Sequence, residues 1–338
     1  MMNGSPEVAI CIPTCNQSQY LPESVSSAYQ QTYPNIEVWV SDDASSDRTP
    51  EVVSQLRTQY PTLKAFRHSQ NLGISGNPSW LLRQPKTQYI ARLDSDDLIQ
   101  PNYLEVLVSL LEKFPEAGYA HAAVQQIDEN GKVARTRRLA RTTGFQSAEE
   151  YLRSSVYGNR STANILLFRR QALESAGFFI PGMNYCDDWG LAVRIADAGW
   201  GNVYASKVLA SYRIWSDVKK VRPKRSIDYL RGCIRVFEKD ISPAFDRRSW
   251  DTKIIHQQRR QMAIHQAAVL DSPLFTDVER TTIVQLLKEL GDCPALQLRL
   301  KLLQLGFGAY FNWQKQIEVG LKDRMKQWLS PWRDRVTS

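Results

Sequence analysis

Short apolar runs alternate with helical patterns along the first third of the chain, and this alternation constrains the fold more than any other feature. Val8–Ile12 and Ile36–Val40 are continuous apolar runs rich in β-branched residues, which is typical of buried strands. Apolar residues at helical spacing follow each run, starting at Leu21 after the first and at Val52 after the second, where Thr49-Pro50 opens the helix. Such alternation predicts parallel strands joined by right-handed crossovers, and therefore an α/β fold.

The pattern continues over predicted strands at Lys64–Arg67 and Tyr89–Leu93, and over predicted helices within Ile74–Leu82 and after Pro101-Asn102. Polar side chains collect where the strands end: Thr14 and Asn16, Asp42 and Asp43, Asn71, then Asp94, Asp96 and Asp97. Ligands of open α/β sheets bind at the carboxyl ends of the strands. Turn chemistry alone does not explain four polar strand ends, so we expect the functional site along this edge.

The fourth of these strand ends carries three carboxylates within four positions, Asp94 to Asp97. Carboxylates this close repel one another and are stabilised by a nearby cation. Carboxylate oxygens are hard ligands that suit Mg²⁺ or Mn²⁺. An acidic turn followed by a helix cap is the structural alternative. An EF-hand loop is disfavoured because its sixth position, Ile99, is not Gly.

Two nucleotide-binding classes lack their signatures here. The first predicted strand is followed by Pro13-Thr14-Cys15-Asn16 and not by a GxGxxG turn. No GxxxxGK[ST] sequence occurs anywhere in the chain. A dinucleotide-binding dehydrogenase and a P-loop nucleotide hydrolase are both disfavoured.

Length and pattern divide the chain in two. Its 338 residues exceed the roughly 250–300 at which single cores stop growing. We predict a main domain over residues 1–218 and a helical C-terminal extension over 219–338. Helical spacing in the extension appears at Tyr229–Phe237, Ile254–Leu270, Val278–Leu290, Leu296–Leu305 and Ile317–Trp328.

Charge and cysteine content bear on compartment and partners. The net charge is +8, and basic clusters at Arg135–Arg141 and Lys219–Arg225 suit phosphates, anionic membranes or nucleic acid, unless they are solvated loops. The five Cys include no CxxC pair, which disfavours a zinc site or a disulfide framework. No signal peptide and no apolar run of about 18 residues is found. We expect a cytoplasmic protein without a nucleic-acid partner.

The last part of the chain interleaves Trp313, Trp328 and Trp332 with several Lys and Arg residues. A basic amphipathic helix with Trp is typical of membrane-surface binding. Packing onto the main domain or onto a partner chain explains the same pattern equally well. Peripheral contact with the inner membrane face therefore stays one of two open alternatives.

Five short motifs, in this order and spacing, resemble one known family. They are Ile12-Pro13-Thr14-Cys15-Asn16, Val40-Ser41-Asp42-Asp43-Ala44-Ser45-Ser46-Asp47, Asn71-Leu72-Gly73-Ile74-Ser75, Leu93-Asp94-Ser95-Asp96-Asp97 and Cys186-Asp187-Asp188-Trp189-Gly190-Leu191-Ala192-Val193-Arg194. With them, the first 215 or so residues are similar to inverting glycosyltransferases of the GT-A fold, in the family numbered two. The resemblance implies a Rossmann-like mixed sheet flanked by helices, with a nucleotide-diphospho-sugar donor across the strand ends.

The resemblance also implies roles for individual residues. Donor-binding roles fall on Pro13, Thr14, Asn16, Asp42, Asp43, Asn71, Asp94, Asp96 and Arg213. Within that set, Asp43 would accept a hydrogen bond from a pyrimidine base, and Arg213 would meet the diphosphate as a bidentate donor. Asp96 and Asp97 would hold a divalent cation, Mn²⁺ or Mg²⁺. Asp188 matches the catalytic base, six residues before Arg194.

Three positions depart from the family pattern. Cys15 stands where an aromatic residue is common, and Pro78-Ser79 stands where an Arg-Asn pair is usual. Trp215 stands where a His able to touch metal or diphosphate is frequent. These departures bear on nucleoside stacking, on one donor contact and on the coordination of the cation.

The predicted function is metal-dependent, inverting transfer of a sugar from a UDP- or dTDP-linked donor to a glycan or lipid-linked acceptor. An ordinary N-cap is the structural alternative for Asp188, because a helix is expected at Leu191–Ala196. Arg160 and Asn164 precede Ile165–Phe168, a predicted strand beside the acceptor. The alternative functions are a nucleotidyltransferase and a non-catalytic nucleotide- or glycan-binding module of the same fold.

Overall fold

The computed structural model describes residues 6–215 and 225–307. The described residues form two compact units. The first unit holds those within Met1–Lys219 and Gly232–Thr252, and the second holds those within Lys220–Arg231 and from Lys253 onward. The sequence assigned everything after residue 218 to the extension, whereas the structure returns residues 232–252 to the first unit.

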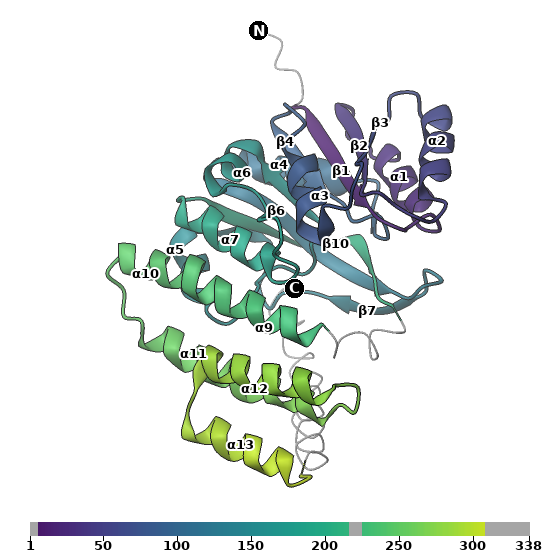
Figure 1. Ribbon diagram of the computed structural model, residues 1–338. Helices are drawn as coiled ribbons and strands as arrows, with labels where there is room; N and C mark the ends of the chain where they lie inside the picture. Colours follow the sequence, from purple (N-terminus) through teal and green to yellow (C-terminus); the bar gives the residue numbers. More distant parts are fainter. Residues whose placement is uncertain (1–5, 216–224, 308–338) are drawn as a thin grey trace. The chain divides into compact units, whose positions relative to one another are not determined.

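Ten strands form one sheet in the first unit (Figure 1). Their order is β3-β2-β1-β4-β9-β6-β10-β5, with β7 added on β6 and β8 on β10. The strands span Val8–Thr14 (β1), Ile36–Asp42 (β2), Lys64–Arg67 (β3), Tyr89–Arg92 (β4), Leu98–Ile99 (β5), Ala117–Ile127 (β6), Val133–Arg137 (β7), Gly144–Gln146 (β8), Leu166–Arg169 (β9) and Gly201–Arg213 (β10).

Parallel pairing joins β1 to β2 and to β4, and β2 to β3, as the strand–helix alternation predicts. β9 is antiparallel to both of its neighbours, β4 and β6, so the sheet is mixed. The α/β fold with a mixed, helix-flanked sheet is therefore confirmed. The carboxyl ends of β1, β2 and β4 lie at one edge because the three strands run in the same direction.

The helices of the first unit connect and cover this sheet. They are α1 (Leu21–Tyr29), α2 (Thr49–Gln59), α3 (Gly73–Leu82), α4 (Tyr103–Lys113), α5 (Ala148–Ser155), α6 (Arg170–Ala176), α7 (Asp187–Asp197), the end of α9 (Ser226–Arg235), a π-helical turn η1 (Val236–Ile241) and α10 (Ser242–Arg247). Val8, Ile10 and Ile12 of β1 are fully buried in one cluster with apolar side chains of α1 and α4. Alternate residues of β1 thus face one layer of helices, as expected of a covered sheet.

The second unit is helical among its described residues. It contains α11 (Lys253–Gln266), the 3-10 turn η2 (Ala267–Asp271), α12 (Asp277–Gly291) and α13 (Pro294–Gln304). Thr276 and Glu279 form a reciprocal capping box at the start of α12. The helical extension is confirmed over these residues, and none of the described helices is long and apolar enough to cross a bilayer. The predicted helix at Ile317–Trp328 lies outside the described residues.

Gly118 in β6 sits where α6, α7 and the following loop approach the sheet. A Cβ there would lie 2.7 Å from Trp200 Cβ, 2.8 Å from Ala172 Cβ and 2.9 Å from Ile195 Cγ2. We expect Gly118→Ala to lower the free energy of unfolding by about 1–3 kcal/mol, because these contacts leave no room for a methyl group. Urea unfolding measures the change. Gly144→Ala in β8 is the control, because its Cβ would meet nothing within 4 Å and its stability should stay near that of the wild type.

Candidate active site

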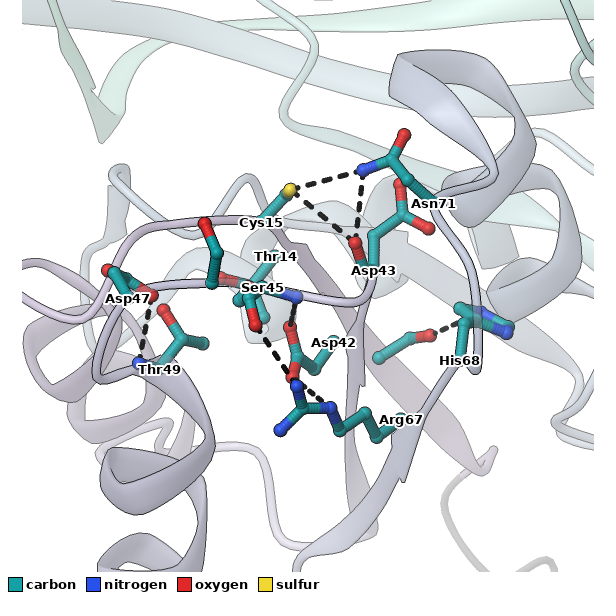
Figure 2. Close-up of polar contacts among 12 residues, drawn as sticks. Thr14, Cys15, Asp42, Asp43, Ser45, Asp47, Thr49, Arg67, His68 and Asn71 are labelled. Atoms are coloured by element: carbon teal, nitrogen blue, oxygen red, sulfur yellow. Dashed lines mark hydrogen bonds and ion pairs between the residues drawn. The ribbon is translucent and has the colours of Figure 1, made fainter.

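The carboxylates of Asp42 and Asp43, at the end of β2, hold the neighbouring segments at this edge of the sheet (Figure 2). Asp42 Oδ1 accepts the backbone N–H of Ser45 at 3.1 Å, and its Oδ2 lies 3.5 Å from Arg67 Nε. The Asp43 carboxylate accepts the backbone N–H groups of Leu72 at 2.6 Å and Gly73 at 3.0 Å. Asp43 therefore anchors the start of α3 beside the strand ends.

Asn71 and Cys15 lie at the same edge of the sheet and contact each other. The Asn71 side-chain amide donates to the backbone oxygen of Asp43 at 3.0 Å and to Cys15 Sγ at 3.4 Å (Figure 2). Burial and the charges of Asp43 and Asp42 raise the pKa of the Cys15 thiol, so Cys15 is a neutral wall of the site.

Asn16 and Thr14 complete the loop after β1. Asn16 has a φ of 53°, a conformation that Asn tolerates better than most residues. Its side-chain oxygen accepts the backbone N–H groups of Ser46 at 2.8 Å and Asp47 at 3.3 Å. The buried hydroxyl of Thr14, next to half-buried Pro13, has no hydrogen-bond partner among the described residues. The structure therefore brings Pro13, Thr14, Asn16, Asp42, Asp43 and Asn71 together at one edge.

The acidic turn after β4, residues Asp94 to Asp97, has a different hydrogen-bond donor at each of its three carboxylates. Arg92 Nε lies 2.9 Å from Asp94 Oδ1, and Trp215 Nε1 donates to Asp96 Oδ2 at 3.1 Å. The backbone N–H of Arg213 donates to Asp97 Oδ1 at 2.8 Å. Asp97 Oδ2 is buried and has no hydrogen-bond partner within the described part of the chain.

This turn carries more negative charge than its surroundings balance. Burial, together with the charge of Asp94, raises the pKa of Asp96 to about 6. Burial and the charges of Asp96 and Asp94 raise the pKa of Asp97 well above its usual range. A cation beside these oxygens would favour their ionised forms.

The residues fit a hard divalent cation. In residues 6–215 and 225–307, no group of three or more His, Cys, Asp or Glu side chains is arranged as a metal cage. Mg²⁺ commonly takes only one or two protein carboxylates and keeps other positions for water and substrate phosphates. Half-buried Asp96 and the unpartnered Oδ2 of Asp97 match that donor set.

The Arg213 guanidinium is occupied by hydrogen bonds and an ion pair within the protein. Its Nε donates to the Asp96 backbone oxygen at 2.8 Å, and its Nη1 donates to the backbone oxygens of Asp128 and Glu129 at 3.0 and 3.2 Å. Its Nη2 lies 3.0 Å from Glu23 Oε2. The sequence assigned this guanidinium to the diphosphate. In the structure all three of its nitrogens are bonded within the fold, so Arg213 here supports the acidic turn.

Asp188 lies in the first turn of α7, one residue inside the helix. The N-cap is Cys186, with a φ of 63° and no side-chain cap hydrogen bond. The structure thus excludes the N-cap alternative for Asp188. Burial raises the pKa of its carboxyl group, and the Asn159 side-chain amide donates to its Oδ2. A carboxylate with a raised pKa is suited to general base catalysis.

Asp188 opens onto a cavity of about 240 Å³. The other lining residues are Arg137, Asn159, Ser161, Thr162, Ala163, Asn164 and Tyr212. Amides and hydroxyls dominate this lining. The strand predicted to run beside the acceptor, Ile165–Phe168, forms as β9 directly after this loop.

Two residues lie near both the acidic turn and Asp188. Burial lowers the pKa of Arg92, but the charges of Asp94, Asp188 and Asp187 outweigh burial and leave that pKa raised. Tyr212 lines the cavity, and burial with the charges of Asp97, Asp94 and Asp96 raises its pKa to about 12. Arg92 thus interacts electrostatically with both the turn and Asp188, whereas Tyr212 interacts with the turn and lines the same cavity as Asp188.

Asp187 supports α7 and directly precedes Asp188 in the chain. Both of its carboxylate oxygens accept the backbone N–H of Ile180 at 3.2 Å, and Arg194 Nη2 lies 3.8 Å away. Arg194 Nε also lies 3.6 Å from the buried Asp240 of η1. Sequence reasoning missed Arg92, Asn159, Tyr212 and Asp240. Only Arg92 carried a local signal, as a charged residue inside a strand that ends in carboxylates.

Comparison with known proteins finds similarity to glycosyltransferases. Residues 9–175 match the model of glycosyl transferase family 2. An uncharacterized glycosyltransferase of Rickettsia typhi is 24% identical over 269 residues, 73% of this chain and 82% of that protein. The chondroitin synthase of Escherichia coli is 30% identical over 128 residues, which are 38% of this chain and 18% of that protein.

Solved structures give the same fold. S. aureus TarS 1–349 in complex with UDP has a TM-score of 0.56 at 15% identity, covering 89% of this chain and 92% of that one. The mannosyltransferase PcManGT from Pyrobaculum calidifontis, in complex with GDP-Man and Mn²⁺, has a TM-score of 0.56 at 20% identity, covering 93% and 84%. The chain is a glycosyltransferase of the GT-A fold, and the part of it that matches the model of glycosyl transferase family 2 is residues 9–175.

Proposed function

We propose that the protein is a metal-dependent, inverting glycosyltransferase that uses a UDP- or dTDP-linked sugar and a glycan or lipid-linked acceptor. Such a reaction would serve polysaccharide or lipopolysaccharide biosynthesis. The carrying observation is that Arg92, ion-paired with Asp94 of the acidic turn, also interacts electrostatically with Asp188. Tyr212 lines the cavity of Asp188 and interacts electrostatically with the carboxylates of the turn. The acidic turn would hold the donor diphosphate through a cation, and Asp188 would accept the proton of the acceptor hydroxyl.

The donor end of the proposal rests on the edge formed by β1 and β2. Thr14, with its unpartnered buried hydroxyl, can donate to or accept from a nucleoside. Asp43 already accepts two backbone N–H groups, and each carboxylate oxygen retains a further acceptor position for a pyrimidine base. Asn71 and Cys15 would line this nucleoside site.

The diphosphate end rests on Asp96 and Asp97. A divalent cation bound there would act as a Lewis acid and stabilise the charge of the departing diphosphate by several kcal/mol. Asp94 is engaged with Arg92, so its proposed contact is with the ribose and not with the cation. Arg213 keeps the backbone of Asp96 in place.

Asp188 would act as the general base. It accepts the proton of the acceptor hydroxyl while that oxygen bonds to the anomeric carbon and the diphosphate leaves from the opposite face. Displacement in a single step inverts the anomeric configuration. The hydroxyl- and amide-lined cavity beside Asp188 suits a sugar, whose hydroxyls need hydrogen-bonding partners.

The two alternative functions find less support. A nucleotidyltransferase would be favoured by a basic, Gly-rich loop after β1, and this chain has Pro13-Thr14-Cys15-Asn16 there. A non-catalytic module would not need a carboxyl group of raised pKa beside a cavity. Asp188 is such a group, which favours an enzyme. The membrane-contact hypothesis rests mainly on Trp313, Trp328 and Trp332, which lie outside the described residues.

Calorimetric titration of UDP and dTDP, with Mn²⁺ and with EDTA, tests the proposal. We expect Mn²⁺ to raise nucleotide affinity at least about tenfold, equivalent to roughly 1.4 kcal/mol, and Asp96→Asn or Asp97→Asn to remove most of that gain. Asp246→Asn, an exposed carboxylate of α10, is the control and should keep it. Equal affinities with Mn²⁺ and with EDTA would remove the metal from the mechanism.

A further inference from the structure

Trp215 lies two residues beyond the end of β10, 119 residues away in sequence from the carboxylate that it contacts. Its indole Nε1–H donates to Asp96 Oδ2 at 3.1 Å. Its ring packs edge-to-face on Tyr20, with 5.0 Å between ring centroids and an interplanar angle of 86°. The Arg213 guanidinium lies over the same Tyr20 ring at 4.4 Å. Packing against Tyr20 therefore fixes Trp215 with its indole N–H directed at the acidic turn.

Among the three carboxylates of the turn, Asp94 has a charged donor, whereas Asp96 and Asp97 accept hydrogen bonds from neutral donors. Asp94 is paired with the cationic Arg92, and Asp97 accepts a backbone N–H. Asp96 accepts from an indole, which is a neutral donor that cannot deprotonate or accept in return. A neutral donor fixes one carboxylate oxygen without bringing a positive charge that would repel a metal ion.

We propose that Trp215 is a positioning residue for the cation site: it holds Asp96 through Oδ2, so that Oδ1 meets the metal in one fixed orientation. The inference rests on the proposed function, because it takes Asp96 as a ligand. Hydrogen-bonding partners of metal ligands orient those ligands, and their loss typically costs about 10- to 100-fold in metal affinity. The Trp at this position thus acts through Asp96 and not as a ligand.

Trp215→Phe removes the N–H donor and keeps an aromatic ring against Tyr20. We expect it to weaken Mn²⁺ binding in the presence of UDP by about tenfold or more, measured by the loss of the free Mn²⁺ signal in electron paramagnetic resonance. UDP affinity in EDTA should equal that of the wild type, because the nucleoside site does not include Trp215. A general loosening of the fold would instead lower both affinities.

Trp39→Phe is a matched control. Trp39 of β2 also donates its Nε1–H to a carboxylate, Glu37 Oε2 at 2.8 Å, away from the acidic turn. The Trp39 variant should bind Mn²⁺ like the wild type. Wild-type affinity in Trp215→Phe would overturn the role of Trp215 and leave the proposed function intact. Failure of the wild type itself to bind Mn²⁺ with UDP would overturn the metal role of Asp96 and, with it, this inference.

Discussion

Asp188→Asn is expected to lower the rate of sugar transfer by about 10²- to 10⁴-fold, the usual contribution of a positioned general base. The fold should persist, because Asn matches Asp in size and its side-chain oxygen can still accept from the Asn159 amide. Donor affinity should also persist, since Asp188 lines the cavity that we propose for the acceptor. Transfer rates at saturating donor, with calorimetry of nucleotide binding, measure both quantities.

The neighbouring carboxylate supplies the control for that experiment. Asp187 accepts the Ile180 N–H and lies near Arg194, so Asp187→Asn should lower stability while leaving the base in place. Its transfer rate, corrected for the folded fraction, should stay within about tenfold of the wild type, well short of the loss that removing a base produces. A large loss in Asp187→Asn, with a near-normal rate in Asp188→Asn, would assign the base to Asp187.

Arg213→Met is expected to lower the free energy of unfolding by about 3 kcal/mol or more. The guanidinium serves the backbone oxygens of Asp96, Asp128 and Glu129, and its side chain is only 1% exposed. Methionine fills similar volume but cannot donate to these acceptors, and each hydrogen bond that involves a charged group contributes about 1.5–3 kcal/mol. Urea unfolding of the full chain measures the difference.

Glu23→Gln is the control for Arg213→Met. The Glu23 side chain is 61% exposed, so losing its ion pair with Arg213 should cost less than about 1 kcal/mol. If Arg213→Met were as stable as Glu23→Gln and lost only nucleotide affinity, the guanidinium would serve the diphosphate, as the sequence motif suggested. The two variants together therefore decide between the supporting role and the donor-binding role of Arg213.

The sequence by itself determined the first half of the sheet and the residues along its edge. The strands Val8–Ile12, Ile36–Val40 and Tyr89–Leu93 correspond to β1, β2 and β4, because β-branched and aromatic runs have a local preference for extended structure. Asp42, Asp43, Asp94, Asp96 and Asp97 follow these strands directly. Their approach to one another follows from parallel strand direction, which the strand–helix alternation already implies.

Only the tertiary structure decided the second half of the sheet. β6 is rich in Ala, including Ala120, Ala122 and Ala123, and Ala favours helices in isolation. These residues form a strand because β6 lies between β9 and β10, where small side chains allow helices to approach the sheet. Likewise, residues 232–252 read as part of a helical extension, and only buried contacts such as Asp240 with Arg194 assign them to the first unit.

Tertiary structure alone also decided what each polar group does. From the sequence alone, Asp188 is either a general base or an N-cap. Its position inside α7, where the Asn159 amide donates to it, excludes the N-cap. Arg213 reads as a diphosphate ligand until its partners, 84 to 190 residues away in sequence, are seen. Periodicity and propensity act over a few residues, whereas a hydrogen bond such as Trp215 to Asp96 depends on the pairing of β10 with β5, which are far apart in sequence. Residue type therefore predicted the chemistry at this edge, and only packing assigned each donor to its acceptor.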